Sequence, residues 1–598
     1  MTKSLKFLLF FFIFSSINSN NYFFEMPLTN NEELSLNKTT SLLFQEFSHF
    51  IISHLKNQKN SNNGFLCNQC EDLVYKLQNI INTYGTKGFY HLITLLCLSI
   101  YDYDICDQNI QSYGFVLIES FINQFIKDLS LCKKLHFCKD DKEYINVDDY
   151  AKRVLSDKPT NKTKEKINKN SKNLKMLQIT DLHIDLNYKV GSKAICDKPM
   201  CCRDPPKEGD TELAGKFGYE GECDINKDLF QSFIDYAYEL KPDFIIWTGD
   251  NSPHDTWEGS QEKVIEATKV LRDMINEKFN YEIPIFPVLG NHEVYPNDLF
   301  NVTDGKKNLL LEMADMYKNY LSEEAYETFK EKGYYSMLLP NTNLRIISIN
   351  CFYCDSWNYY LINNNKSDAK QMLKWFEETL RSSEENNEYV YILNHFPLNA
   401  DFSLIECARR FIALYDRYEY IIRGIFSGHT HHHDIVPVYS YFNRTKITHL
   451  NYVSSSLTTH SHQLPSFSIF NIDSTTFQIK DYDVYIFNMN QSNILLKPIW
   501  YKSYTATSLF NVEDMSDVYK IINKDVEGDY IIKEYADSKY GKSVCHKESA
   551  IRKAKCVLTT DTFYDFYFCN YPKIFALKQD MFVMILNYFE GPWEVDKE

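Results

Sequence analysis

Hydrophobic and polar residues follow different periods in different parts of the chain. Between residues 64 and 140, apolar residues such as Leu73 and Leu77 recur at helical spacing. From Leu174 onward, short apolar runs of strand length alternate with amphipathic helical stretches, which is typical of a layered α/β domain. After about Trp500 the pattern becomes helical again. We therefore expect a small all-α domain, an α/β domain and a C-terminal helical part.

Composition sets the boundaries between these zones. The chain has 598 residues, which is too long for one ordinary hydrophobic core. A stretch rich in Lys, Asp and Asn and poor in apolar residues separates the first two zones, and we expect it to be a solvated, mobile linker. The predicted segments are a signal peptide at 1–20, a helical domain at 63–142, a linker at 143–172, an α/β domain at 173–500 and a helical subdomain at 501–598.

The N-terminus and the sixteen cysteines indicate the secretory route. The apolar run Leu5–Ile17 follows Lys3 and Lys6 and is too short to cross a bilayer, so it predicts a signal peptide, with a retained signal anchor as the alternative. Cysteines on this route are expected in disulfides. Sequons predict glycosylation at Asn37, Asn161, Asn301, Asn365, Asn443 and Asn490. We expect a secreted or lysosomal protein.

The charge balance is acidic. Sixty-four Lys and Arg residues stand against 80 Asp and Glu residues, which gives a net charge of -16. Such a surface repels nucleic acids and anionic membranes near pH 7, so we expect no nucleic-acid partner. Sixteen histidines and many carboxylates gain protons near pH 5, which weakens the repulsion in an acidic compartment. Simple solubility explains the charge equally well. The sequence predicts no protein partner.

Six cysteines frame the first helical zone. Cys67 and Cys70 have C-x2-C spacing, but no histidine lies at zinc-finger spacing and the compartment oxidises thiols, so a zinc site is disfavoured. The cysteine order resembles a saposin-type domain, and this resemblance implies lipid engagement, with a purely stabilising prodomain as the alternative. It also implies the pairs Cys67–Cys138, Cys70–Cys132 and Cys97–Cys106.

Five polar motifs each follow an apolar run of strand type. In chain order they are Asp181-Leu182-His183, Gly249-Asp250-Asn251, Gly290-Asn291-His292-Glu293, Asn394-His395 and Gly428-His429-Thr430-His431. Open α/β sheets bind ligands at the carboxyl ends of their strands, so we expect the motifs to meet in one crevice. Carboxylate, imidazole and amide groups together suit zinc, iron or manganese. Two neighbouring cations need a shared anionic ligand. The motifs therefore predict a centre with two metal ions.

The order and spacing of these motifs resemble the calcineurin-like metallophosphoesterase superfamily, whose fold is a four-layer β-sandwich flanked by helices. With the saposin-like zone in front, the chain more narrowly resembles the acid sphingomyelinase family. Thr248–Asp255 carries a histidine four residues after the motif aspartate, as that family does. The family's disulfides imply the pairs Cys196–Cys201, Cys202–Cys223 and Cys354–Cys407. We also expect Cys556–Cys569 to pair, which leaves Cys351 and Cys545 without obvious partners.

The resemblance implies a role for each site residue. One zinc ion would be held by Asp181, His183, Asp250 and His431, and a second by Asp250, Asn291, His395 and His429. His254 and His292 would lie beside the scissile phosphate, where one of them protonates the leaving group. The implied reaction is attack of a metal hydroxide on sphingomyelin, giving ceramide and phosphocholine, with the saposin-like domain presenting the substrate from membrane surfaces.

Three other functions compete with this one. Acid sphingomyelinase-like phosphodiesterases of nucleotides or other phosphate esters resemble the catalytic region but lack the saposin zone. Purple acid phosphatases place a tyrosine where this chain has Pro253. A lipid-binding protein with an inactive esterase half conflicts with the complete ligand set. Among the remaining histidines, we expect His432 and His433 at the surface, and His460 and His462 in an exposed loop.

Overall fold

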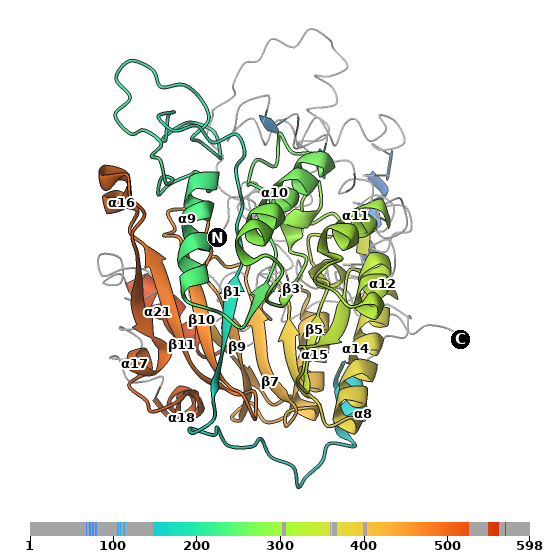
Figure 1. Cartoon of the computed structure of the whole chain (residues 1–598). Helices are drawn as coiled ribbons and strands as arrows, with labels where there is room; N and C mark the ends of the chain where they lie inside the picture. The colour runs from blue at the N-terminus through green and yellow to red at the C-terminus, as the bar shows by residue number, and fades with distance from the viewer. Residues whose placement is uncertain are drawn as a thin grey trace. The chain divides into compact units, whose positions relative to one another are not determined.

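The computed structural model describes residues 147–301, 307–358, 360–361, 367–398, 403–525, 548–560 and Cys569, with scattered positions between 67 and 116. The chain divides into two compact units, and residues 145–358 and 366–573 form the unit that contains the sheets (Figure 1). The predicted signal peptide and most of the saposin-like zone lie outside the described residues. Within that zone Cys67 and Cys106 are disulfide-bonded, and the partners expected for them lie outside the described residues.

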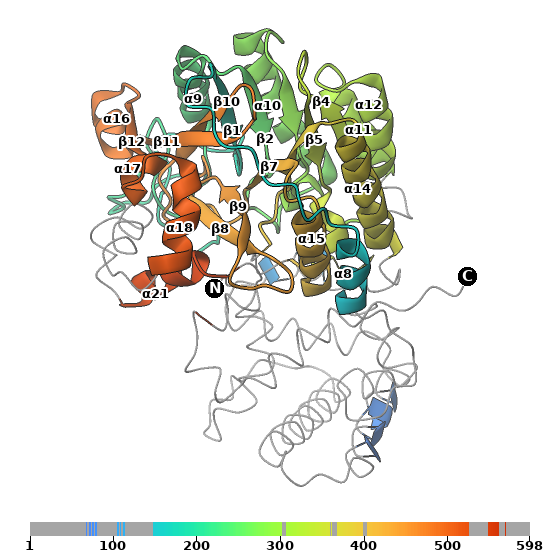
Figure 2. The ribbon, with the colours of Figure 1, turned by 90° about the horizontal axis from the view of Figure 1, so that it is seen from below.

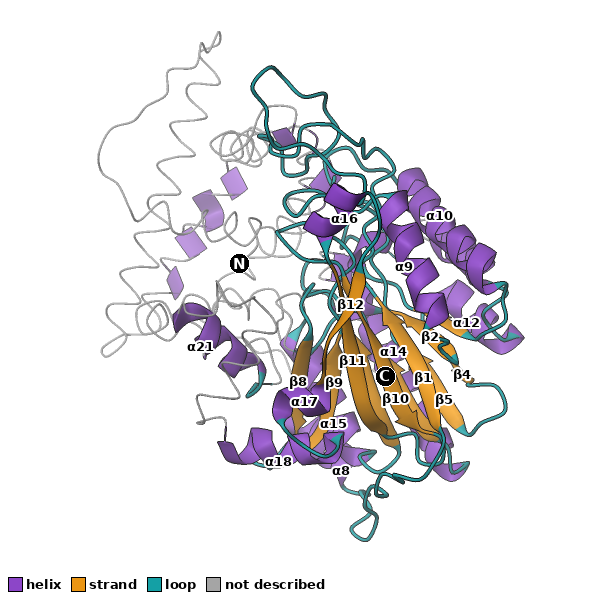
Figure 3. Cartoon of the chain, turned by 60° about the vertical axis from the view of Figure 1, so that its left-hand side comes forward, coloured by secondary structure: helices purple, strands orange, loops and turns teal. Residues whose placement is uncertain are grey.

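Two six-stranded sheets form the centre of this unit (Figure 3). The first has the order β12-β11-β10-β1-β2-β3, with strands β1 Asn173–Ile179, β2 Phe244–Trp247, β3 Ile285–Pro287, β10 Ser466–Asp473, β11 Ile479–Phe487 and β12 Trp500–Thr505. The second has the order β4-β5-β6-β7-β9-β8, with strands β4 Tyr335–Leu338, β5 Leu344–Ser348, β6 Tyr389–Leu393, β7 Ile422–Ser427, β8 Asp434–Tyr439 and β9 Ile447–Val453. The predicted α/β class with two sheets is confirmed.

Helices surround the two sheets. They are α8 Val147–Leu155, α9 Lys227–Glu239, α10 Gln261–Phe279, α11 Lys307–Tyr317, α12 Glu323–Lys332, α14 Ser367–Glu385, α15 Ile405–Arg417, α16 Met489–Leu495, α17 Ala506–Phe510, α18 Met515–Asp525 and α21 Glu548–Val557, with 3-10 turns η4 Asn291–Glu293 and η5 Cys351–Cys354. Helices α17, α18 and α21 add side chains to the core between the sheets. Figure 2 shows α9 and α10 on one side of the sheets and α14 and α15 on the other. Among the described residues, none of these helices is long and apolar enough to cross a membrane.

The main hydrophobic core lies between the two sheets. It joins Met176 and Ile246 of the first sheet to Ile346, Tyr391 and Phe426 of the second, and all five side chains are buried. Strands covered on both faces read as continuous apolar runs in the sequence, because neither face meets water. Burial of this core accounts for the runs that precede the polar motifs.

Parallel pairing brings the ends of the central strands together. β1, β2 and β3 are parallel neighbours in the first sheet, and β5, β6, β7 and β9 are parallel neighbours in the second. Their carboxyl ends therefore point to the same edge of each sheet. Because each polar motif directly follows β1, β2, β3, β6 or β7, all five motifs emerge at this edge.

The predicted linker differs from expectation. Residues 147–155 form α8, which packs against α15, as Figure 2 shows. Lys158 Nζ lies 2.6 Å from a carboxylate oxygen of Asp416 and 2.7 Å from one of Glu419. Charged residues that suggested a mobile segment find partners near α15, so this segment is attached rather than free. Composition alone does not distinguish a solvated lysine from a paired one.

The C-terminal boundary also differs. β12 begins at Trp500 and pairs antiparallel with β11, so the α/β fold continues past the predicted limit at residue 500. Beyond it, α17, α18 and α21 are helical, as the periodicity predicted.

Candidate metal centre

The first cluster of polar side chains contains Asp181 and His183 after β1, Asp250 after β2 and His431 after β7. His431 Nε2 lies 3.2 Å from His183 Nε2 and 3.3 Å from Asp181 Oδ1. His183 Nε2 lies 3.6 Å from Asp250 Oδ2 and 3.9 Å from Asp181 Oδ1. Asp181 and His183 are fully buried, and His431 is 15% exposed. The atoms that converge are all potential ligand atoms, which is how side chains are arranged around a common cation.

A second cluster lies beside the first and shares Asp250 with it. His395 Nε2 is 3.2 Å from Asp250 Oδ2 and 3.0 Å from Asn291 Oδ1. His429 Nδ1 is 3.2 Å from the same Asn291 oxygen. Asp250 Oδ2 therefore faces His183 on one side and His395 on the other. One carboxylate oxygen between two clusters is the position of a ligand that bridges two cations.

Backbone carbonyl groups fix the orientation of two of these imidazoles. His183 Nδ1 lies 2.8 Å from the Ser252 carbonyl oxygen, and His395 Nδ1 lies 2.7 Å from that of Thr248. A carbonyl only accepts hydrogen bonds, so each Nδ1 carries a proton, and each Nε2 is the nitrogen that a cation in the cluster would bind once its own proton is displaced. Metal-binding histidines in proteins are held by this arrangement.

The charge distribution of the clusters also suits cations. Burial alone would lower the pKa of His183, but the nearby carboxylates of Asp181 and Asp250 raise this pKa to about 9. The pKa of His395 is likewise raised to about 9, against the effect of burial, by Asp250. These buried carboxylates create a site that favours positive charge strongly enough to act on nearby imidazoles. Mixed oxygen and nitrogen ligands in such a field fit divalent metal ions, zinc among them.

Unusual backbone conformations place the ligands. Positive φ angles between 41° and 71° occur at Asp181, His183, Asp250, His429 and His431. Residues other than glycine rarely adopt positive φ angles. Those that do are strained, and such strained residues are concentrated at functional sites. Close packing explains the adjacent glycines: a Cβ atom at Gly290 would collide with Asp250, and one at Gly428 with Thr180.

Glu293 joins two of the motif loops, a role that sequence reasoning missed. Its carboxylate accepts hydrogen bonds from the backbone N–H of Asp250 at 2.9 Å and of Asn251 at 2.7 Å. Burial and the charge of Asp250 raise the pKa of Glu293 to about 7. The available signal was its place at the end of the motif beginning at Gly290. The residue positions the proposed bridging ligand without lying among the ligand atoms.

His292 lies next to the first cluster. Its ring centroid is 4.7 Å from that of His183, and its backbone N–H donates to Asp250 Oδ1 at 2.8 Å. The side-chain amide nitrogen of Asn297 lies 2.8 Å from His292 Nδ1. Burial lowers the pKa of His292 to about 3. An amide that donates to Nδ1 favours the neutral ring with its proton on Nε2.

His254 packs against the rings of both His183 and His292, with ring-centroid distances of 3.9 Å to His183 and 5.0 Å to His292. Its Nδ1 is 2.8 Å from Asp224 Oδ1, and its backbone N–H donates to Asp224 Oδ2 at 2.7 Å. The hydroxyl of Thr458 donates to Asp224 Oδ1 at 2.7 Å. The sequence did not single out Asp224, which carries no motif of its own.

Two predictions about the remaining histidines were wrong. His460 was expected to be free in a loop, but it stacks on His254 at 4.2 Å with an interplanar angle of 11°. His433 was expected at the surface, yet it is 7% exposed and its Nε2 lies 3.0 Å from the Ser468 hydroxyl, because the turn into β8 directs it inward. His462 is exposed, as predicted, and His432 is half-buried.

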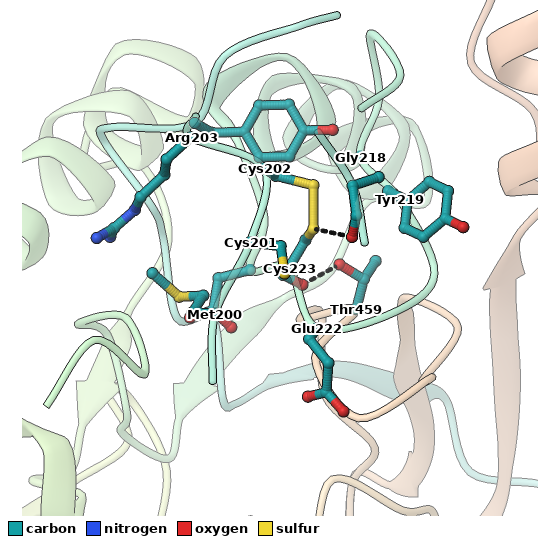
Figure 4. The surroundings of a disulfide bond; sticks show 12 residues. Met200, Cys201, Cys202, Arg203, Gly218, Tyr219, Glu222, Cys223 and Thr459 are labelled. Carbon is teal, nitrogen blue, oxygen red and sulfur yellow. Dashed lines mark hydrogen bonds between the residues drawn. A yellow bond between two sulfur atoms is a disulfide. The ribbon is translucent and has the colours of Figure 1, made fainter. Parts of the chain in front are cut away.

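Four of the expected disulfides are present. They are Cys196–Cys201, Cys202–Cys223, Cys354–Cys407 and Cys556–Cys569. Figure 4 shows Cys202–Cys223 next to Thr459, whose hydroxyl donates to the Cys223 carbonyl at 2.5 Å. Cys223 immediately precedes Asp224, so the disulfide and this hydrogen bond hold the segment that supports His254. Cys351 is a buried free thiol. Cys545 lies outside the described residues.

Two ligand clusters that share a carboxylate, with two imidazoles alongside, define the centre of a dimetal phosphoesterase. Residues 174–433 match the calcineurin-like phosphoesterase family. The chain belongs to this family, in the group of sphingomyelin phosphodiesterases and their relatives, as the motifs predicted.

The matched relatives differ in how much of their length the chain spans. It is 29% identical to sphingomyelin phosphodiesterase B of Dictyostelium discoideum over 68% of this chain and 66% of the relative. It is 30% identical to cyclic GMP-AMP phosphodiesterase SMPDL3A of Bos taurus over 63% of this chain and 85% of that protein. A solved dimetal phosphatase of Danio rerio matches with a TM-score of 0.33 and 13% identity over 52% of this chain and 95% of that chain.

Proposed function

We propose that the protein is a zinc-dependent phosphodiesterase that hydrolyses sphingomyelin to ceramide and phosphocholine. The observation that carries the proposal is the position of Asp250 between two ligand clusters, with His254 and His292 beside them. Relatives named sphingomyelin phosphodiesterase support the choice of substrate. In this proposal one zinc ion binds Asp181, His183, Asp250 and His431, and the other binds Asp250, Asn291, His395 and His429.

The protein's own groups supply positioning and proton transfer. When bound, a zinc pair supplies Lewis-acid activation of the phosphate and lowers the pKa of water. Asp224 accepts a hydrogen bond from Nδ1 of His254. Nε2 of His254 is therefore the nitrogen that donates a proton to the departing alkoxide of ceramide. Asn297 holds His292 with its proton on Nε2, where it donates to a phosphoryl oxygen as negative charge develops there.

A nucleotide phosphodiesterase activity is the second candidate. Two observations favour it: the chain spans 85% of a cyclic GMP-AMP phosphodiesterase, and a pocket of about 280 Å³ is lined by Lys189, Lys193, Lys198 and Trp257 among others. Lysines beside an aromatic ring suit a phosphorylated base better than a choline group, while Asp204 and Glu258, which also line the pocket, offset part of this charge, with Asp204 at 2.9 Å from Lys198 Nζ. The disulfide-bonded Cys67, in the saposin-like zone, favours the lipid substrate instead.

Purified full-length protein distinguishes these activities. We would measure hydrolysis of sphingomyelin, phosphatidylcholine and cyclic GMP-AMP, with and without a zinc chelator, together with the bound metal by elemental mass spectrometry. The proposal predicts zinc in the protein, the highest kcat/KM on sphingomyelin and loss of activity with the chelator. Preference for the cyclic dinucleotide would establish the second candidate. Chelator-resistant activity or a metal-free active protein would refute both.

The proposal places the protein on the secretory route, either secreted or in lysosomes. The sequons at Asn161, Asn443 and Asn490 are exposed, which suits glycosylation. Asn301 is only 8% exposed, which does not fit a glycan in the folded protein. Glycosylation at Asn301 stays a prediction, because a three-residue pattern carries no information on burial. Asn37 and Asn365 lie outside the described residues.

A further inference from the structure

The carboxyl end of α16 carries three consecutive aliphatic side chains that project into solvent. Ile494, Leu495 and Leu496 are 79%, 62% and 65% exposed. Single exposed apolar residues are ordinary on protein surfaces, but a consecutive run is unexpected unless it has a function. We call these three residues the apolar tip.

The backbone at Leu496 would suit a residue without a side chain. Leu496 is the C-cap of α16, with φ 50° and ψ 30°, and its N–H donates to the Ser492 carbonyl. Helices that end in this left-handed conformation usually have glycine there, because a Cβ atom is strained. A large exposed leucine at this position is unfavourable for the folded chain by itself. This observation points to a use for the side chain outside the fold.

The apolar tip lies at the same edge of the sheet as the metal centre. β10 is antiparallel to both β1 and β11, so β11 runs in the same direction as β1. α16 follows the end of β11 as Asp181 and His183 follow the end of β1, and Figures 1 and 3 show α16 at this edge. Leu464 is 42% exposed. It lies near the start of α16, because the carbonyl of its neighbour Pro465 accepts a hydrogen bond from the N–H of Phe487, the last residue of β11, at 2.9 Å. Apolar surface therefore continues along the edge.

Charge around the tip differs from that of the whole chain. Residues 489–512 contain no Asp or Glu and include Lys497 and Lys502, although the chain carries a net charge of -16. Tyr501, on β12, is 45% exposed. Asp483, at 3.5 Å from Lys502 Nζ, is an acidic group that faces this region from β11. Aliphatic side chains with neighbouring lysines and an aromatic residue are typical of segments that lie in a membrane interface.

We infer that the apolar tip inserts into the lipid–water interface of the membrane that contains the substrate and docks the catalytic unit there. This inference rests on the proposed action on a lipid, and it adds a docking site to the one expected of the saposin-like zone. A stable protein interface needs about 20–30 residues on each side. The tip has three, so a lipid surface, which requires no matching shape, fits it better.

Vesicle binding tests the inference without catalysis. Full-length protein and the triple variant Ile494→Ser, Leu495→Ser, Leu496→Ser are sedimented with vesicles of equimolar phosphatidylcholine and sphingomyelin, with a chelator present to stop turnover. We expect binding at least about tenfold weaker for the variant. A matched control, with Tyr281, Leu311 and Leu338 each changed to Ser, removes exposed apolar groups from other elements and should bind like the wild type. Hydrolysis of a soluble chromogenic diester should be unchanged in both.

A second variant guards against misfolding of the first. Leu496→Gly relieves the backbone, so it should keep or raise Tm and still weaken vesicle binding. Equal binding by the triple variant and the wild type would overturn the inference even if sphingomyelin were hydrolysed. A dimer that dissociates in the triple variant would also overturn it and assign the tip to a second copy. Absence of hydrolysis by the wild type would refute the proposed function and leave the binding result readable.

Asn490 provides one more check, because it lies one turn before Ile494 in α16 and begins a sequon. A glycan there would stand between the apolar tip and the bilayer, so the inference requires this sequon, predicted above to be glycosylated, to carry no glycan in the membrane-binding protein. The inference therefore predicts that Asn490→Gln leaves vesicle binding unchanged or increases it. Weaker binding by this variant would contradict it.

Discussion

The buried carboxylate of Asp224 and the partly buried ring of His254 form a pair, with Asp224 Oδ1 at 2.8 Å from His254 Nδ1. Burial alone would raise the pKa of Asp224, but His254 and the other nearby imidazoles hold it well below its usual range, whereas burial lowers the pKa of His254 against the opposing effect of this carboxylate. Thr458 donates to the same carboxylate, so the acceptor cannot rotate freely. The contact with Asp224 fixes which nitrogen of His254 faces the two ligand clusters. A carboxylate behind an imidazole selects its tautomer and stabilises the protonated ring.

Asp224→Asn should lower kcat on sphingomyelin by about 10²-fold, because the amide no longer stabilises a protonated His254. The loss should be smaller on a diester with a nitrophenolate leaving group, which departs without a proton. Steady-state kinetics on the two substrates measures this difference. Asp235→Asn, an exposed change on α9, is the matched control and should match the wild type on both. An equal loss on both substrates would mean that Asp224 supports the fold and not proton transfer.

His292→Ala should lower kcat by ~10²–10⁴-fold while bound zinc remains. The ring of His292 lies next to the ligand clusters, but its Nδ1 faces the side-chain amide of Asn297. Elemental analysis and kinetics on the same preparation separate the two effects. Full activity in this variant would remove His292 from the chemistry, and loss of zinc would make it a ligand.

Asp250→Asn should release more metal than Asp181→Asn, because Asp250 faces both clusters and Asp181 faces one. Metal per chain, measured after dialysis against a weak chelator, should fall below one in the first variant and stay near one in the second. Metal binding also stabilises the fold, by about 2.7 kcal/mol at a concentration one hundred times Kd, so Tm should fall with metal content. Similar metal loss in both variants would argue against a bridging role.

Lys164 makes stability depend on pH. Its Nζ donates to the Thr448 carbonyl at 2.7 Å, and burial lowers its pKa from 10.5 to about 7. The unfolded chain binds this proton more tightly than the folded one, so the penalty is complete below pH 7 and disappears as pH rises toward 10.5. The Tm of Lys164→Met should therefore exceed that of the wild type by the largest margin at low pH. This difference in Tm should shrink as pH rises.

Melting curves of Lys164→Met and the wild type, recorded between pH 7 and pH 10.5, measure how the difference in Tm changes with pH. Lys162→Met, which changes an exposed lysine of the same segment, should show no such trend. A gain that does not change with pH would mean that Lys164 is charged in the folded protein.

Local sequence patterns predicted which polar motifs would meet, because the chemistry and the strand signal coincide, while the assignment of each ligand came from the family resemblance. Asp181 and His183 follow β1, whose last four residues are buried, and His429 and His431 follow β7, all of whose residues are buried. A strand with both faces buried must be apolar, and its end is where polar residues become possible. The order of the motifs then indicated the fold class. No long-range information was needed for these residues.

Partners that carry no motif could not be found in this way. Asp224 lies 30 residues from His254, and Thr458 lies 234 residues from Asp224. Nothing in the local sequence distinguishes Asp224 from the many exposed aspartates. The same holds for His460, whose loop position suggested exposure but whose ring stacks on His254.

The sequence by itself determined which residues meet at the carboxyl ends of the strands, since apolar runs, glycines and ligand types are all local properties. Only the tertiary structure decided which imidazole nitrogen faces the site and which carboxylate lies between the two ligand clusters. It also decided that the segment predicted to be a mobile linker packs against the α/β unit. These depend on contacts between residues far apart in the chain, and such contacts form only when the two sheets pack together and bury their shared core.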